Sequence, residues 1–192
     1  MPGLISPSAL VLLGVNLGVA GFALIGDWSL PTILMSYVTQ SIIIGLFQAK
    51  KMLDLKEFST EGFKINGQPA EPTPATKRST VVFFLFHYGI FHAVYAGFVI
   101  SSGAPDWLSV FGAAAAFFAN HLTSYLAHRG ETLKKLPNIG GMMFFPYIRI
   151  LPMHFFILFG ALAAGGPYAT AAFLLMKTAA DEIMHLIEHR NA

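Results

Sequence analysis

The sequence contains no cysteine and few charged residues. The absence of cysteine excludes disulfides, thiolate catalysis and sites in which cysteine ligates zinc or an iron–sulfur cluster. Only 11% of the residues are charged, whereas a soluble domain carries roughly a quarter. Hydrophobic residues make up 55%, and the mean hydropathy is +0.61. Too few polar side chains are present to cover a soluble globule, so we expect a lipid bilayer to surround this chain.

Recognisable catalytic motifs are also missing. The sequence has no HExxH, GxSxG or P-loop pattern, and no Ser–His–Asp arrangement follows from spacing, so whether the chain is an enzyme stays open. The net charge of +2 gives no reason to expect a nucleic-acid partner. No Lys or Arg precedes the first apolar run, which is longer than the apolar part of a signal peptide. We therefore interpret this run as a retained span.

Six apolar stretches have the length of about 20 residues that a helix needs to cross the hydrocarbon core. They are Leu4–Ile25, Leu30–Met52, Thr80–Ser101, Trp107–His128, Met142–Ala164 and Tyr168–His189. Short connections rich in Gly, Pro and Asp separate most of them. The sequence predicts an all-α fold, a six-transmembrane-helix bundle that forms a single integral membrane domain over residues 1–192.

The positions of Lys and Arg predict the orientation of this bundle. Most of these cations flank or occupy two longer connections, at 53–79 and 129–141, whereas the three short connections contain none. The positive-inside rule places both longer connections and both termini in the cytoplasm of a multi-pass cell-membrane protein. Trp28 and Trp107 then lie together at the outer interface, as an aromatic belt requires.

The cytoplasmic loop at 53–79 is polar and rich in glycine and proline. Such a composition offers little apolar surface to bury, so we expect a mobile loop with a short hairpin around Asn66-Gly67. Replacement of Glu61–Thr76 by a Gly/Ser linker is then expected to leave folding unchanged.

Ionisable residues within the predicted spans indicate a functional site, because they are costly in hydrocarbon. Lys177, Asp181 and His185 recur every four residues and share one stripe of the sixth span. A buried Asp181 needs a partner, which Lys177, a histidine or a metal cation could supply. Lys177 is the difficulty for a metal, because a second cation nearby would oppose it.

Histidines at similar depths on four spans favour a metal as that partner. The predicted ligands of one divalent metal in the cytoplasmic half of the bundle are His87, His154, Asp181 and His185, with His121 as a further ligand. Imidazole and carboxylate without thiolate suit zinc first, and also iron, nickel or manganese. A coordination position open to the cytoplasm would allow a bound water to act as a nucleophile.

Other interpretations of the same residues stay open. The histidines, Lys177 and Asp181 could form the relay of a proton-coupled transporter or carrier, or two facing histidines could bind a b-type haem. A lone intramembrane histidine is also commonly a helix–helix hydrogen-bonding residue. We expect Gln40, Asn16 and Asn120 to join helices in this way. Arg149 is expected to extend to the cytoplasmic interface, and the sequence leaves room for a homo-oligomer.

Three patches resemble a prokaryotic family of small polytopic membrane proteins of unknown function. They are Ser-Tyr-Val-Thr-Gln-Ser-Ile-Ile-Ile-Gly at 36–45, Phe-His-Tyr-Gly at 86–89, and the stretch from Arg149 to the Lys-x3-Asp-x3-His pattern at 177–185. Val38 and Gln40 replace the Trp and Glu of the family, and Tyr95 stands where a second His is common. The resemblance implies the same membrane fold and no particular activity. It singles out His87, Arg149, His154, Lys177, Asp181 and His185.

Overall fold

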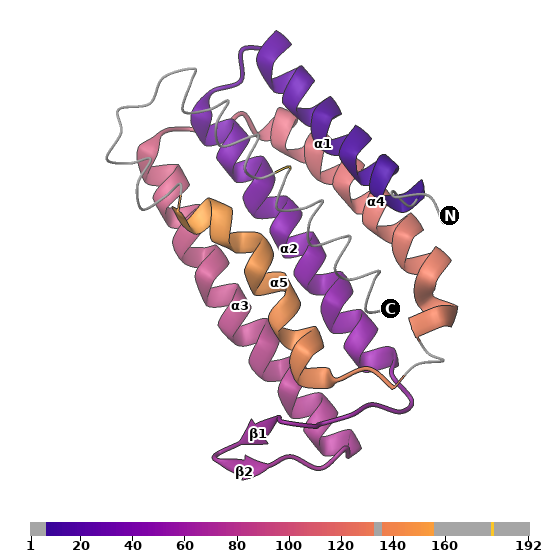
Figure 1. Ribbon diagram of the computed structural model, residues 1–192. Coiled ribbons are helices and arrows are strands. Elements are labelled where there is room, and N and C mark those ends of the chain that lie inside the picture. The colour runs from indigo at the N-terminus through magenta and orange to yellow at the C-terminus, as the bar shows by residue number, and fades with distance from the viewer. Residues whose placement is uncertain (1–6, 133–135, 156–177, 179–192) are drawn as a thin grey trace.

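The computed structural model describes residues 7–132, 136–155 and 178. The chain forms helices α1 (Pro7–Ile25), α2 (Leu30–Asp54), α3 (Pro74–Ser102), α4 (Trp107–Thr132) and α5 (Ile139–Phe155), with strands β1 (Lys64–Ile65) and β2 (Gln68–Pro69) between α2 and α3 (Figure 1). The predicted helical fold class is confirmed for these residues. The predicted sixth span, at 168–189, lies outside the described residues except for Thr178.

Helix α2 is the central element of the bundle. It packs against α3, α4 and α5, while α1 lies along α4 and α3 lies along α5 (Figure 1). Its side chains are buried around most of its circumference, and Leu34, Tyr37 and Met52 are almost completely enclosed. A helix that is apolar and buried on nearly all sides belongs to the interior of a bundle.

Polar caps define where the helices begin. The Ser29 hydroxyl accepts the Thr32 amide at 3.4 Å, and the Thr73 hydroxyl accepts the Thr76 amide at 3.2 Å. Asp106 caps α4, because its carboxylate accepts the Ser109 hydroxyl at 2.5 Å and the Leu108 amide at 3.2 Å. These two bonds, the Ser109 bond foremost, lower the pKa of Asp106. Side-chain acceptors of this kind satisfy amides that the first helical turn leaves open.

Hydropathy predicts the apolar parts of the helices but misses their polar ends. Helix α3 begins at Pro74 rather than Thr80, α4 continues to Thr132, and α5 begins at Ile139 rather than Met142. The added turns carry charged or small residues, so their hydropathy is too low for the apolar stretches to include them. Among the described residues, α2 and α3 are the helices long and apolar enough to cross a membrane.

The hairpin predicted around Asn66-Gly67 is confirmed. Strands β1 and β2 pair antiparallel, with Lys64 opposite Pro69 and Ile65 opposite Gln68. Asn66 and Gly67 both have positive φ angles, of 52° and 80°. A two-residue turn of this geometry matches the twist of its strands, and Asn-Gly is its preferred sequence.

The structure corrects the expectation that the rest of this loop is a mobile linker. Ser59 forms a parallel bridge with Asn138, in which Ser59 N donates to Pro137 O at 2.9 Å and Ile139 N donates to Ser59 O at 3.0 Å. Asn138 also donates to the Glu61 carbonyl at 2.8 Å. Phe58 is buried, so a few apolar side chains anchor a segment whose overall composition is polar.

We therefore predict that replacing Glu61–Thr76 with a Gly/Ser linker destabilises the bundle. The exchange removes Phe63, whose ring fills the space beside Gly140, and the Thr73 cap of α3. A lost cap alone costs about 1 kcal/mol. Thermal unfolding in detergent, followed by tryptophan fluorescence, should show a lower midpoint. The double variant Lys64→Ala, Gln68→Ala changes exposed hairpin residues and should match the parent; an equally stable linker variant would contradict the packed loop.

Candidate functional site

Helices α2 and α3 approach each other closely where Tyr88 packs against Gly45. A Cβ atom on Gly45 would lie 2.5 Å from Cε1 and 2.8 Å from Cδ1 of Tyr88. The Tyr88 hydroxyl lies 3.0 Å from the Ser41 carbonyl and 2.8 Å from the Ser41 hydroxyl. Since the carbonyl can only accept, Tyr88 donates to it and accepts the proton of the Ser41 hydroxyl.

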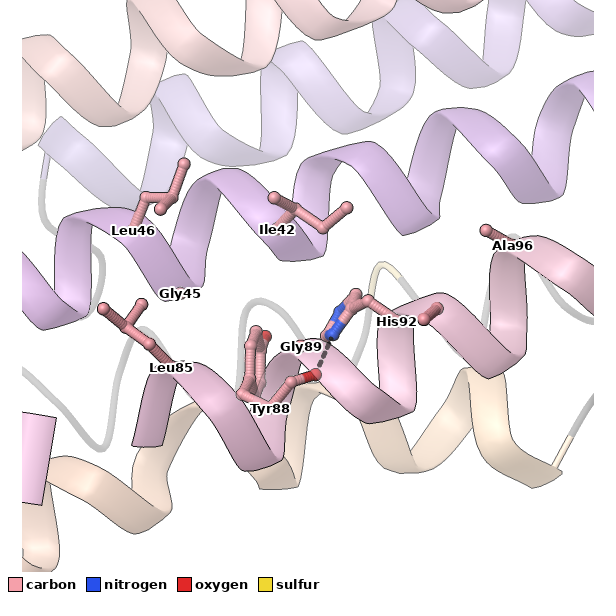
Figure 2. A pocket seen from close by; sticks show the side chains of 9 residues that line it. Ile42, Gly45, Leu46, Leu85, Tyr88, Gly89, His92 and Ala96 are labelled. Carbon is pink, nitrogen blue, oxygen red and sulfur yellow. Dashed lines mark hydrogen bonds between the residues drawn. The ribbon is translucent and has the colours of Figure 1, made fainter. Parts of the chain in front are cut away.

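His92 follows Tyr88 by one turn and is almost completely buried, with 3% of its surface exposed. Its Nδ1 lies 2.7 Å from the Tyr88 carbonyl oxygen, and the two rings lie 4.3 Å apart (Figure 2). A carbonyl cannot donate, so Nδ1 carries the proton and Nε2 of the neutral ring is an acceptor. Nε2 is buried and has no hydrogen-bond partner among the described residues.

Two further histidines are paired with tyrosines between α3 and α5. His87 Nδ1 lies 2.9 Å from the Tyr147 hydroxyl, and His154 Nδ1 lies 3.0 Å from the Tyr95 hydroxyl. Helices α3 and α5 run in the same direction, because the later residue of α3, Tyr95, pairs with the later residue of α5, His154. Tyr95 follows His87 by eight residues, so the pairs lie about 12 Å apart along the helix axis.

These aromatic and imidazole side chains form a continuous band, which we call the Tyr–His ladder. Its members are His87, Tyr88, His92 and Tyr95 of α3 and Tyr147 and His154 of α5. Neighbouring ring centroids along it lie 5.5 Å (Tyr88 and Tyr147), 5.9 Å (His92 and Tyr95) and 6.1 Å (Tyr95 and His154) apart. Phenol and imidazole can each donate and accept, so the band carries exchangeable protons along several turns of the bundle.

The predicted metal ligands are only partly described by the structure. His87 and His154 belong to the ladder at its two different levels, and His121 of α4 packs its ring 6.3 Å from that of Phe47. Asp181, His185 and Lys177 lie outside the described residues. Within the described ranges, no three His, Asp or Glu side chains are grouped closely enough to hold a metal. The complete metal shell stays a prediction.

Three other polar residues of the predicted spans, Asn16, Gln40 and Arg149, are buried within the bundle. Gln40 Nε2 donates to Asn16 Oδ1 at 3.3 Å, which is the interhelical contact predicted for both side chains. Arg149 is buried, with 7% of its surface exposed. It belongs to the interior of α5, and the expectation that it extends to the cytoplasmic interface stays a prediction.

Sequence reasoning selected His87 and passed over His92, although His92 is the buried histidine of α3. The periodicity of apolar and aromatic residues along α3 could have identified His92. Buried residues of α3 recur at Phe84, Tyr88, His92, Tyr95 and Val99, the spacing of three or four that marks one helix face. His87 falls off this face and is exposed. Tyr147 carries no comparable sequence signal, because its role depends on the pairing of α3 with α5.

The Gly45 contact generates a direct prediction. Gly45→Ala places a methyl carbon 2.5 Å from Cε1 of Tyr88. Phe84, His92 and Tyr147 confine the Tyr88 ring at centroid distances of 5.0, 4.3 and 5.5 Å. Overpacking of this kind costs about 1–3 kcal/mol, so the unfolding midpoint should fall. Gly97→Ala is the matched control, because no atom lies within 4 Å of the added methyl. Equal midpoints for the two variants would exclude the close contact.

The comparisons with known proteins give a family but no activity. No curated protein and no solved structure matches the chain. The family described as "Family of unknown function (DUF6498)" matches residues 3–192, which is nearly the whole sequence. The chain therefore belongs to this family of unknown function.

Proposed function

We propose that the chain is a six-span membrane protein with both termini in the cytoplasm. Its surface supports this proposal, because large apolar side chains face outward. Phe22, Phe86 and Leu108 expose 72%, 70% and 83% of their surfaces. The buried set contains polar residues beside its apolar majority, namely Asn16, Thr32, Ser36, Gln40, Ser41, Gln48, Thr80, His92, Asn120 and Arg149. An apolar exterior around an interior that also holds hydrogen-bonded polar side chains suits hydrocarbon surroundings.

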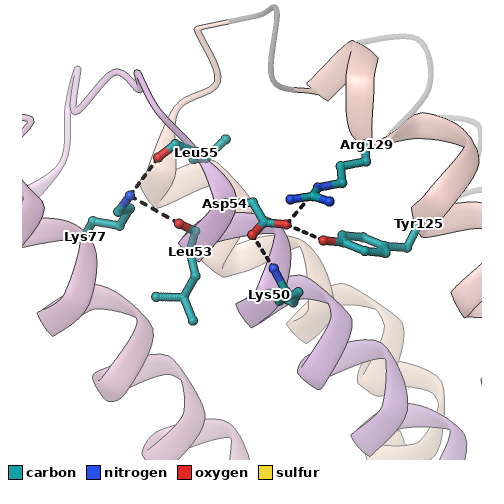
Figure 3. A network of polar contacts seen from close by, with 7 residues as sticks. All are labelled: Lys50, Leu53, Asp54, Leu55, Lys77, Tyr125 and Arg129. Carbon is teal, nitrogen blue, oxygen red and sulfur yellow. Dashed lines mark hydrogen bonds and ion pairs between the residues drawn. The ribbon is translucent and has the colours of Figure 1, made fainter.

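The cations at one end of the bundle support the proposed orientation (Figure 3). Asp54 at the end of α2 accepts hydrogen bonds from Lys50 and Tyr125, and Arg129 Nε lies 3.4 Å from its carboxylate. Lys77, at the start of α3, donates to the carbonyls of Leu53 and Leu55 at 3.2 and 2.7 Å. Cations of both longer connections thus gather at the end that the positive-inside rule assigns to the cytoplasm.

The topology can be tested cleanly because the native chain has no cysteine. Single variants Gln68→Cys, in the hairpin, and Ala104→Cys, between α3 and α4, place one thiol at each exposed site. In intact cells, a membrane-impermeant maleimide should label Ala104→Cys only, and permeabilisation should expose Gln68→Cys. Labelling of both thiols from the same side would refute the six-span orientation.

We propose further that the Tyr–His ladder relays protons, as part of a proton-coupled carrier. The observation that supports this function is the pairing of His87 with Tyr147 and of His154 with Tyr95 at two levels about 12 Å apart. Groups that both give and take a proton, spread along the membrane normal, suit a relay. One metal shell would instead require all its donor atoms about 2 Å from the ion.

A metal site is the second candidate, and His92 is the observation in its favour. Metal-binding histidines usually donate one ring N–H to a carbonyl or carboxylate and bind the ion through the other nitrogen. His92 has this arrangement, with Nδ1 held by the Tyr88 carbonyl and Nε2 as the acceptor. The predicted ligands His154, Asp181 and His185, together with His87 and His121, remain part of this proposal.

A relay predicts proton uptake that depends on single hydroxyl groups. Purified protein in potassium-loaded liposomes with valinomycin should take up protons, reported by an enclosed pH dye. Tyr95→Phe keeps the ring but removes the partner of His154, so uptake should fall about 10- to 100-fold. Tyr125→Phe makes the same change outside the ladder and should have little effect.

Two measurements on the same purified protein distinguish the proton relay from the metal site. Elemental analysis and an absorption spectrum of the purified protein should show neither stoichiometric metal nor a Soret band if the ladder acts as a relay. Bound zinc, or uptake that Tyr95→Phe leaves unchanged, would contradict the relay. A Soret band would favour the haem interpretation over both.

A further inference from the structure

A cavity of about 320 Å³ lies between α2 and α3 beside the Tyr–His ladder. Its walls are apolar, among them Leu46 of α2 and Leu85 of α3 (Figure 2). The small residues Gly89, Ala93 and Ala96 also line the cavity and take up little of its space. Cavities of this volume fall within the range that binds small molecules, which are typically held by apolar walls and a few polar groups.

The mouth of the cavity is apolar and exposed. Ile42, Leu46 and Leu85, which line the cavity, expose 39%, 57% and 39% of their surfaces. In the membrane location proposed above, this side of the bundle faces lipid rather than water. A ligand that enters from this side is therefore a molecule dissolved in the bilayer.

The polar part of the cavity is formed by Tyr88 and His92. The Tyr88 hydroxyl is already held by Ser41, as donor to its carbonyl and acceptor from its hydroxyl. The His92 imidazole extends from α3 toward α2 (Figure 2), and its Nε2 acceptor has no partner among the described residues. A buried acceptor without a donor is unfavourable, so a ligand that brings one donor gains affinity here.

We infer that this cavity binds an amphiphilic molecule from the bilayer, an apolar body with a single hydroxyl that donates to His92 Nε2. The apolar walls select the hydrocarbon part, and the fixed tautomer of His92 selects a donor over a pure acceptor. A charged headgroup is disfavoured because none of the described residues that line the cavity is ionised. The inference rests on the proposed membrane location and is independent of proton relay.

The test uses a photoactivatable diazirine derivative of an alkylphenol, with the full-length protein in phosphatidylcholine nanodiscs. Mass spectrometry should locate labelling within residues 42–46 and 85–96. Competition by 4-hexylphenol should be about 10-fold more effective than by hexylbenzene, which has the same apolar body without the hydroxyl. His92→Phe should retain labelling but remove this difference.

Two matched variants keep the test decisive if His92→Phe does not fold. Ala93→Phe fills the cavity from an exposed position of α3 and should abolish labelling, whereas Ala127→Phe makes the same change on α4 outside the cavity. Labelling that persists in Ala93→Phe would overturn the site. Equal competition by 4-hexylphenol and hexylbenzene would overturn the role of the hydroxyl. Neither result depends on proton uptake, so failure of the relay leaves this site testable.

Discussion

The contact between Tyr88 and Gly45 is the constraint on which the rest of the structure depends. It brings α2 and α3 together where glycine is required, and the Ser41 bonds fix the rotation of the Tyr88 ring. The Tyr88 backbone carbonyl, one turn before His92, then fixes the tautomer of that imidazole. The cavity between the same two helices adjoins this contact, because Gly45 and Tyr88 also line it. The residue that packs α3 against α2, Tyr88, therefore also determines the tautomer of His92.

Helix α2 reaches each of the other described helices with a polar bond. Gln40 donates to Asn16 of α1, Ser41 bonds Tyr88 of α3, Gln48 donates to the Met142 carbonyl of α5 at 2.7 Å, and Asp54 accepts from Tyr125 of α4. In hydrocarbon the apolar surfaces of helices gain little by association, so small residues and hydrogen bonds determine which helices pair. The polar side chains of α2 give each neighbour a defined place.

The sequence predicts most of what depends on local pattern. The lengths of the apolar stretches predict the helices, and the Asn66-Gly67 dipeptide predicts the hairpin. Pairing between distant segments leaves no such pattern, so the bridge between Ser59 and Asn138 and the bond between His87 and Tyr147 could not be found. Depth along the predicted spans selects His87 but not His92, because depth alone does not show which face of α3 is buried. The stripe that contains Asp181 lies outside the described residues, and its role stays a prediction.

The parallel course of α3 and α5 has a consequence for motion. Both hydroxyl–imidazole pairs join the same two helices, and their separations along the two chains nearly match, so one register satisfies both. A slide of α5 by one helical turn, about 5.4 Å, would bring Tyr147 from the level of His87 to that of Phe91, a ring without a polar atom. His154 would leave Tyr95 in the same movement. A slide of α5 along α3 therefore breaks both bonds together rather than one after the other.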